Sequence, residues 1–353
     1  SLITKVYVPK YIFPLSKILS SCINLGFAMI VLFLIVFTQG LKPNVYYFLI
    51  PYAVMCMVMF ATGVGLVLSS MMVYFRDTQF LYGVVTLFDE ESMMKLRATC
   101  QLDYHFSQPT PAVFLLRPQS GLAQQIIQEE WQVTPLLAVT SYNDNFGNLC
   151  DRVLFPMGDY QVSLTVELYT SERIDVAPGM PKTPIEQLPS DTMVYLLPSR
   201  YCLPEFLLQE AQMITQDFAE GYDKAAAICA YIHQNFTYQY GSSTADTTAL
   251  ETWQHKKGVC RDFAHLGISL SRALDMPARM VVGYLYQLDP MDLHAWYEVF
   301  IGDRWYTFDA TQSAPKGGRV ILGYGRDAAD VAFATFFAPF ELKDMKVNVE
   351  KID

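Results

Sequence analysis

The sequence has little charge, few histidines and no closely paired cysteines, and each shortage excludes a class of protein. Only 17% of the 353 residues are charged and 52% are hydrophobic, which excludes a disordered chain and indicates contact with lipid. The net charge is −10 and no basic run is present, so we expect no nucleic-acid partner. The seven cysteines include no Cys-x-x-Cys pair, which favours reduced thiols over a disulfide scaffold or a zinc ribbon. We expect neither a metal nor a cofactor.

Residues 1–88 contain the two longest uncharged stretches. Residues 18–41 form a stretch of 24 and residues 43–75 one of 33, whereas a helix crosses a bilayer in about 20 residues. We predict a transmembrane helical hairpin here; two buried core helices are the alternative. The flanking Lys and Arg residues place both ends of the hairpin, and the chain fused after it, in the cytoplasm. The chain begins with Ser1 instead of Met, which indicates a fragment or a processed product.

Two segments of this region are similar to a known transporter family. Lys-Val-Tyr-Val-Pro-Lys-Tyr-Ile-Phe-Pro at 5–14 and Gly-Leu-Val-Leu-Ser-Ser-Met-Met-Val-Tyr-Phe-Arg-Asp at 65–77 resemble the permease subunit of ABC exporters of surface polysaccharide. The resemblance ends after two spans and implies a membrane anchor through residues 1–88. The join near residue 88 is either a natural fusion or an artefact of gene assembly. The remaining chain is membrane-anchored and cytoplasmic in the first case, and cytoplasmic without an anchor in the second.

From residue 94 onward, apolar and polar residues alternate. A period of two is the pattern of a half-buried strand. The strands predicted from this alternation and from shorter apolar runs are 94–106, 111–116, 153–156 and 160–168. We predict a small antiparallel β-sandwich over residues 94–185, which ends in a linker rich in proline at 177–184.

A cysteine follows two predicted helices, at 204–218 and 222–236. In the segment Lys-Gly-Val-Cys-Arg-Asp-Phe-Ala-His-Leu at 257–266, Cys260 opens an amphipathic helix. The free amides and the dipole at a helix N-terminus stabilise an anion, which suits both a thiolate and the oxyanion of a tetrahedral intermediate. Cys260 is therefore the candidate nucleophile. A buried structural cysteine is the alternative.

A thiolate nucleophile needs a proton acceptor, and the chain has only five histidines. Four of them are poorly placed. One lies in a predicted strand, one on a helix well before the nucleophile, one around the helix from the cysteine, and one in a loop without an orienting partner; these are His105, His233, His265 and His255. His294 remains, at the start of an apolar strand.

The strand that starts at His294 continues into a predicted hairpin. A Gly-Asp step joins residues 294–301 to residues 304–309, which is a tight-turn signal. A two-residue loop makes Asp309 the diagonal neighbour of His294 on the same face, at roughly 7 to 8 Å between Cβ atoms. We expect Asp309 to accept the Nδ1 proton and to leave Nε2 for Cys260. A three-residue loop would reverse this parity.

The sequence around these three residues also resembles that of a known enzyme family. The segments Gly-Val-Cys-Arg-Asp-Phe-Ala-His-Leu at 258–266, Arg-Ala-Leu-Asp-Met-Pro-Ala-Arg-Met-Val-Val-Gly-Tyr at 272–284, His-Ala-Trp-Tyr-Glu-Val at 294–299 and Trp-Tyr-Thr-Phe-Asp at 305–309 resemble the bacterial transglutaminase-like cysteine peptidase family. The similarity implies an α+β fold, in which a papain-like transglutaminase core at 186–353 follows the β-sandwich.

The resemblance also implies roles for individual residues. Cys260 is the implied nucleophile, His294 the general base and acid, and Asp309 the residue that orients the imidazole. Tyr238 lies where related enzymes place an aromatic group near the oxyanion; a packed tyrosine is the alternative.

The leading hypothesis is a thiol enzyme that forms an acyl-enzyme at Cys260 and hydrolyses peptide or amide bonds in a protein or peptide substrate. Two alternatives stay open. One is a transglutaminase that cross-links proteins, and the other is a non-enzymatic membrane transport or scaffold component in which residues 1–88 carry the function.

Overall fold

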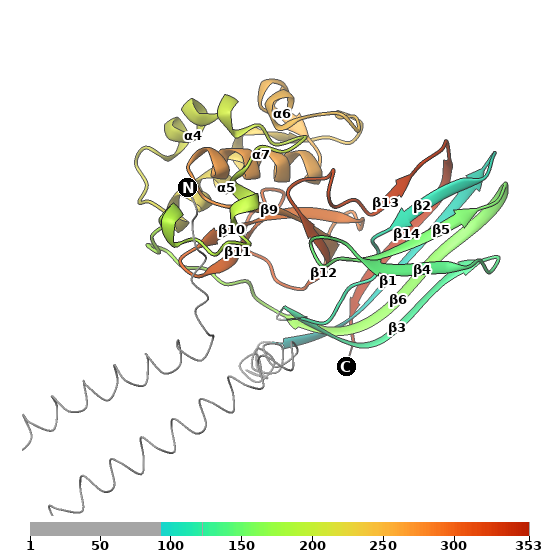
Figure 1. The fold of residues 1–353 in the computed structure, drawn as a ribbon. Helices are drawn as coiled ribbons and strands as arrows, with labels where there is room; N and C mark the ends of the chain where they lie inside the picture. Colours follow the sequence, from blue (N-terminus) through green and yellow to red (C-terminus); the bar gives the residue numbers. More distant parts are fainter. Residues whose placement is uncertain (1–92, 122, 353) are drawn as a thin grey trace, which may run out of the picture. The chain divides into compact units, whose positions relative to one another are not determined.

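The computed structural model describes residues 93–121 and 123–352 (Figure 1). The transmembrane hairpin, the membrane anchor and the permease-like segments predicted for residues 1–88 lie outside the described residues. Within the described ranges, no helix is both long enough and apolar enough to cross a membrane. The described chain consists of a β-rich part and a part that carries Cys260.

The β-rich part is a sandwich of two four-stranded sheets (Figure 1). One sheet has the strand order β14-β1-β6-β3 and the other the order β13-β2-β5-β4, and all neighbours are antiparallel. The strands are β1 (Met93–Phe106), β2 (Thr110–Phe114), β3 (Gln124–Thr134), β4 (Val139–Asn143), β5 (Leu149–Phe155), β6 (Gly158–Ser171), β13 (Ala334–Phe336) and β14 (Glu341–Lys351). We call these eight strands the β domain.

Alternating side chains fill the space between the two sheets. Every second residue of β1 is buried along its whole length. Aromatic rings of the two sheets meet there: the ring centroids of Phe106 and Phe155 are 4.5 Å apart, and those of Tyr104 and Phe114 are 6.1 Å apart. Burial of each such ring contributes roughly 1.5 to 3 kcal/mol. The four strands predicted from alternation are confirmed.

The β domain does not end at residue 185. β14 pairs with β1, with Leu96 opposite Lys351, and β13 pairs with β2. The predicted division into 94–185 and 186–353 therefore places the last two strands in the wrong domain. In β14 only Val349 is buried, so this strand lacks the apolar alternation from which the others could be predicted.

The second part of the chain, which we call the core, is a layer of helices on an antiparallel sheet (Figure 1). The helices are α4 (Leu208–Thr215), α5 (Tyr222–Asn235), α6 (Ala249–His255) and α7 (Cys260–Ala273). The sheet order is β11-β10-β9-β12, and the strands are β9 (Ala278–Leu285), β10 (His294–Ile301), β11 (Arg304–Phe308) and β12 (Arg319–Gly325). The predicted helix 222–236 matches α5. The predicted helix 204–218 is a 3₁₀ turn at Pro204–Phe206 followed by the shorter α4.

Two positions in the centre of the core require glycine, one for close packing and one for a turn. A Cβ at Gly267 of α7 would lie 2.4 Å from the ring of Tyr297 in β10, so only glycine allows this helix to lie on this strand. Gly302 has a φ of +66° and turns the β10–β11 hairpin. Ile301 pairs with Arg304 and Tyr297 with Phe308, which confirms the predicted two-residue loop and its register.

Side-chain amides of the β domain close the free edge of β12. Gln124 donates from Nε2 to the carbonyl of Ile321 (2.7 Å) and accepts at Oε1 from its N–H (2.8 Å). Asn148 makes the same pair of bonds to Tyr324, both at 2.8 Å. A Cβ at Gly323 would lie 2.7 Å from Oδ1 of Asn148. The two amides replace a neighbouring strand and fix the β domain to the sheet that carries His294.

The predicted linker at 177–184 has no secondary structure, but it is held against the core. The N–H of Tyr222 donates to the carbonyl of Met180 (2.9 Å), and Nζ of Lys182 donates to the carbonyl of Leu274 (3.1 Å). Gly221, with a φ of +100°, leaves room for this contact, because a Cβ there would lie 2.2 Å from the Met180 oxygen.

Candidate active site

The N-terminus of α7 holds Cys260 in a fixed turn. Asp262 is fully buried, and its Oδ2 accepts the backbone N–H of Val259 at 2.9 Å, while Oδ1 accepts from Nη2 of Arg261 at 2.9 Å. A Cβ at Gly258 would lie 2.7 Å from the Cβ of Asp262, so the glycine makes room for the carboxylate. The carboxylate occupies the first turn of α7, where it meets the positive end of the helix dipole. Cys260 itself is half-buried.

His294 is the first residue of β10 and is almost completely buried. Its backbone lies opposite Gly283 of β9, and its ring stacks on Trp296 with centroids 6.0 Å apart. Its Nε2 lies 2.8 Å from Oδ2 of Asp309 and 3.5 Å from Oγ1 of Thr311. The side chain of Cys260 is a further neighbour, because hydrogen bonding to it contributes to the raised pKa of the ring. The structure thus brings the three predicted site residues together.

Asp309 follows β11 directly, and its Oδ2 lies 2.8 Å from Nε2 of His294. The expectation that Asp309 would bind Nδ1 is therefore wrong, and the nitrogen left for Cys260 is Nδ1. The reason is geometric. A diagonal pair across a hairpin has well-separated Cβ atoms, so only the distal ring nitrogen reaches the carboxylate, whereas the proximal nitrogen stays close to its own strand.

The charges of this group depend on one another. Burial lowers the pKa of His294, but the charge and hydrogen bond of Asp309 and the hydrogen bond with Cys260 raise it to about 9. Burial raises the pKa of Asp309, but the positive charges of His294 and Arg319 hold it well below its usual range. The site therefore favours an imidazolium between a carboxylate and the sulfur.

Two residues that the sequence did not single out complete the surroundings of Asp309. Nη2 of Arg319 lies 2.9 Å from Oδ2, the oxygen that also binds His294. Thr311 donates to Oδ1 from its backbone N–H (3.1 Å) and from Oγ1 (2.7 Å). The Thr311 hydroxyl could have been suspected, because Asp-x-Thr commonly forms such a local turn. No local signal connects Arg319, ten residues further on, with Asp309.

Tyr238 lies beside Cys260 on a short parallel pair of strands, β7 (Thr237–Tyr238) and β8 (Lys257–Gly258). Burial and the neighbouring Cys260 thiol raise the pKa of the Tyr238 hydroxyl well above its usual range, and the Cys260 backbone acts on this pKa in the opposite direction. The ring is nevertheless 40% exposed. The partial exposure of Tyr238 distinguishes it from a packed core tyrosine, and its role near an oxyanion stays a prediction.

The other four histidines have different partners. His105 of β1 lies 2.6 Å from Asp159, and His233 of α5 lies 3.0 Å from the carbonyl of Ala310. His265 lies in the middle of α7, and its Nε2 accepts the N–H of Ala328 at 3.1 Å. His255 is the last residue of α6 and not part of a loop as expected. In the described part of the chain, no group of three or more His, Cys, Asp or Glu residues could hold a metal ion.

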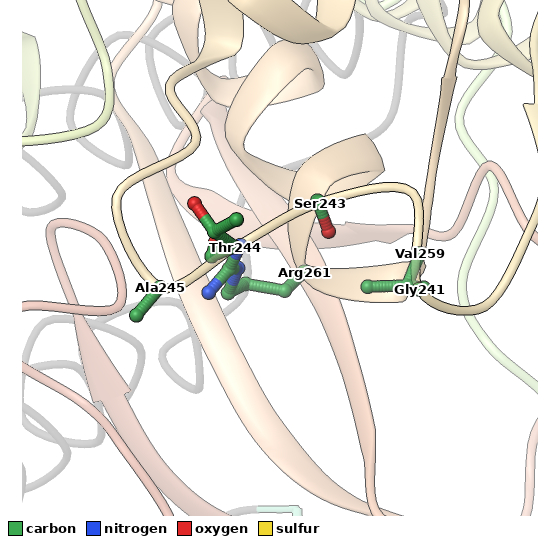
Figure 2. A pocket seen from close by; sticks show the side chains of 6 residues that line it. All are labelled: Gly241, Ser243, Thr244, Ala245, Val259 and Arg261. Carbon is green, nitrogen blue, oxygen red and sulfur yellow. The ribbon is translucent and has the colours of Figure 1, made fainter.

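A hollow of about 390 Å³ adjoins the cysteine (Figure 2). Its walls come from the loop before α6 and from the two chain neighbours of Cys260; they are Gly241, Ser243, Thr244, Ala245, Val259 and Arg261. Nη2 of Arg261 donates to the carbonyl of Thr244 at 2.5 Å, which ties the loop to the start of α7. Most of the side chains that line the hollow are small.

Comparisons with known proteins agree with this geometry. Residues 209–310, which include Cys260, His294 and Asp309, match the family described as the transglutaminase-like superfamily. A crystal structure described as that of a "putative cysteine protease" from Cytophaga hutchinsonii is similar with a TM-score of 0.71 and 34% sequence identity, and the match covers 74% of this chain and 91% of that one.

Two mycobacterial relatives match a similar share of this chain as the crystal structure does. An uncharacterized protein of Mycobacterium leprae is 24% identical over 261 residues, and the match covers 68% of this chain and 91% of that protein. An uncharacterized protein of Mycobacterium tuberculosis is 27% identical over 282 residues, with 67% of this chain and 85% of that protein covered. In all three comparisons the similarity exceeds the 102 residues of the matched family segment and so includes the β domain or part of it.

Proposed function

This chain belongs to the transglutaminase-like superfamily, and from that premise we propose that it is a thiol hydrolase that cleaves peptide or amide bonds through an acyl-enzyme at Cys260. One observation carries the proposal. The His294 ring contacts Cys260 and, through Nε2, a carboxylate that is fully supplied with donors. A ring held in this way can stay protonated beside a thiolate and pass that proton to a leaving group.

In the first half of the reaction, the Cys260 sulfur attacks the carbonyl carbon and the C=O electron pair moves onto the oxygen. The backbone N–H of Cys260 at the start of α7 and the Tyr238 hydroxyl are the donors available to that oxyanion. Collapse of the intermediate breaks the C–N bond. Nδ1 of His294 gives its proton to the departing amine, and a thioester remains on Cys260.

In the second half, the neutral His294 takes a proton from water at Nδ1, and the hydroxide adds to the thioester. Collapse of this intermediate expels the Cys260 thiolate and releases the carboxylic acid. Asp309 stays ionised throughout, because its two oxygens accept from His294 and Thr311 and it forms an ion pair with Arg319. Its role is to hold the ring and to stabilise the imidazolium.

Hydrolysis is preferred to cross-linking because a relative with 34% identity is described as a putative cysteine protease. The hollow in Figure 2 is where a peptide segment next to the scissile bond would lie. Its walls are neither strongly apolar nor uniformly charged, so we expect a protein or peptide substrate with small or polar side chains at that point.

The test uses the full chain, a mixture of peptides of known sequence and detection of newly formed amines. Wild-type protein should release amines and Cys260→Ala should not. A matched control is Cys150→Ala, which removes a thiol of the β domain and leaves the proposed nucleophile in place. Incorporation of dansylcadaverine without amine release would favour cross-linking. Absence of both activities would contradict the proposal and favour a scaffold component.

Attachment to the membrane through residues 1–88, with the enzyme on the cytoplasmic side, is a separate proposal from the sequence. Fractionation of cells that produce the full chain, with an alkaline carbonate wash, tests it. Recovery in the washed membrane pellet is expected, and recovery in the supernatant would contradict it.

A further inference from the structure

We propose that Arg319 is a positioning residue that shares the carboxylate of Asp309 with His294, and that the β domain holds Arg319 in place for this task. The inference deepens the proposed function and rests on it for its catalytic meaning. The juxtaposition itself can be tested without a substrate.

Arg319 occupies the first position of β12 and is only 6% exposed. Its Nη2 lies 2.9 Å from Oδ2 of Asp309, and its Nε donates to the carbonyl of Lys316 at 2.9 Å. The guanidinium lies over the ring of Trp296, 4.8 Å from the centroid, and Trp296 stacks on His294 in turn. The arginine is thus held on three sides.

Two cations share one oxygen of the Asp309 carboxylate. His294 and Arg319 both contact Oδ2, so the arginine takes part of the negative charge that would otherwise stabilise the imidazolium. Because both groups lie on the same carboxylate oxygen, the positive charge of Arg319 also repels a protonated His294 ring. Arg319 therefore limits how firmly His294 keeps the proton that it must give to the leaving amine.

Other titratable groups surround this pair. Those that interact with His294, Asp309 or Arg319 are Cys260 of α7, Cys229 of α5, Tyr297 of β10 and Lys316 before β12. His233 lies nearby on the carbonyl of Ala310, and Tyr238 lies beside Cys260. Burial lowers the pKa of Lys316 and raises that of Cys229 to about 12. Arg319 is the buried permanent cation in contact with the carboxylate.

The β domain binds the strand that carries Arg319. Thr170 of β6, itself buried, donates from Oγ1 to the carbonyl of Arg319 at 2.8 Å. Two residues further along β12, Gln124 makes its paired bonds to Ile321. The start of β12 therefore keeps its position because the β domain binds it, and the role of that domain extends to the geometry of Asp309.

The experiment measures the titration of His294 by NMR of the imidazole in the full chain. Arg319→Gln should raise the pKa of His294 by about one unit, because the repelling charge and the competitor for Oδ2 are gone. Arg319→Lys keeps the charge and should leave the pKa within roughly a third of that shift. In an amine-release assay, the alkaline limb of the Arg319→Gln profile should move upward, with a loss of turnover of about threefold to tenfold.

Matched variants separate positioning from simple stability. Arg279 forms another arginine–carboxylate pair of the same sheet, with Glu298 at 2.6 Å, and Arg279→Gln should leave the His294 titration unchanged. Thr170→Val should raise the His294 pKa by less than Arg319→Gln does. Thr165→Val, on an outward-facing position of the same strand, should not change it.

An unchanged or lowered His294 pKa in Arg319→Gln would overturn the inference. If that variant does not fold, Thr170→Val is measured instead. An unchanged His294 pKa in Thr170→Val would also overturn the inference. The titration needs no substrate, so the two proposals can fail separately. If the protein shows these pKa shifts but no hydrolytic activity, the proposed function is contradicted and the sharing of Asp309 by His294 and Arg319 is still supported.

Discussion

Two histidines are buried in the core, and their surroundings give them opposite acid–base properties. His265 lies in the middle of α7 and stacks on Tyr201, with centroids 5.0 Å apart. Burial lowers its pKa to about 3. The pKa of His294 is raised to about 9 although burial acts on it in the same direction. A protonated ring at neutral pH therefore requires a carboxylate, and the hairpin register supplies Asp309 to His294 alone.

The two rings show where the core places a buried positive charge. His265 acts as an uncharged ring. Its Nε2 accepts the N–H of Ala328 and so fixes the segment after β12 to α7. His294 has a charged role, because its ring lies between Asp309 and Cys260. The two positions should therefore respond differently to substitution and to pH.

Substitution of the two histidines should affect turnover very differently, and the largest loss of turnover is expected at His294. His294→Ala removes the proposed proton carrier and should lower turnover by about 10⁴ or more, as loss of a triad histidine does. His265→Gln keeps an acceptor for the Ala328 N–H and should stay within a few-fold of wild type. Amine release under saturating peptide measures both. Similar losses in the two variants would erase the distinction between the rings.

A smaller loss is expected when the carboxylate that distinguishes the two rings is removed. Asp309→Asn should lower the pKa of His294, because burial is then unopposed. Turnover should fall by roughly 10 to 10³, which is less than in a serine triad because a thiolate–imidazolium pair exists before the substrate arrives. The pH profile of turnover is the measurement. Full turnover with an unshifted profile would show that Asp309 does not have this role.

His265 should affect the pH dependence of stability. Its pKa is about 3 in the folded chain against an ordinary 6.5, so below pH 6.5 the unfolded chain binds a proton that the folded chain does not. Folding stability should fall with decreasing pH at up to about 1.4 kcal/mol per unit from this residue. His294 has the opposite sign: its contribution is complete below pH 6.5 and is lost as the pH rises through about 9.

Urea unfolding of wild type and His265→Gln at pH 7 and pH 5 measures the acid side. The variant should lose less stability over this interval than wild type. Equal losses in the two proteins would mean that His265 is protonated in the folded state.

The mildest change leaves both histidines in place. Tyr238→Phe removes a hydroxyl next to the Cys260 backbone and should lower turnover by about tenfold. This is less than the roughly 10² to 10³ expected for loss of a main oxyanion donor, since the backbone N–H remains. The limbs of the pH profile should not move. A shifted limb would assign the tyrosine to proton transfer instead.

Much of the site could be predicted from local sequence. Cys260 at a helix start, His294 at a strand start and the Gly-Asp turn all rest on patterns a few residues long, and the register that follows from the turn is confirmed. The choice of ring nitrogen failed, because it depends on how far each atom reaches across the hairpin, which strand parity does not specify.

Other features could not be predicted because they depend on contacts distant in sequence. Arg319 meets Asp309 only when β12 has been placed on the far side of β9, and that placement depends on amides of the β domain. β14 carries one buried residue, Val349, and joins the sandwich mainly by backbone pairing with β1. Neither feature leaves a periodic signal in the chain.

The pair of Cys260 and His294 is the central claim, and alkylation by iodoacetamide tests it most directly. At mildly acidic pH His294 is protonated and stabilises the thiolate beside it, so wild-type protein should be labelled at a single fast site. Cys260→Ala should abolish that label, and Asp309→Asn should slow it. Equal fast labelling of wild type and Cys260→Ala would contradict the assignment of the nucleophile and the account built on it.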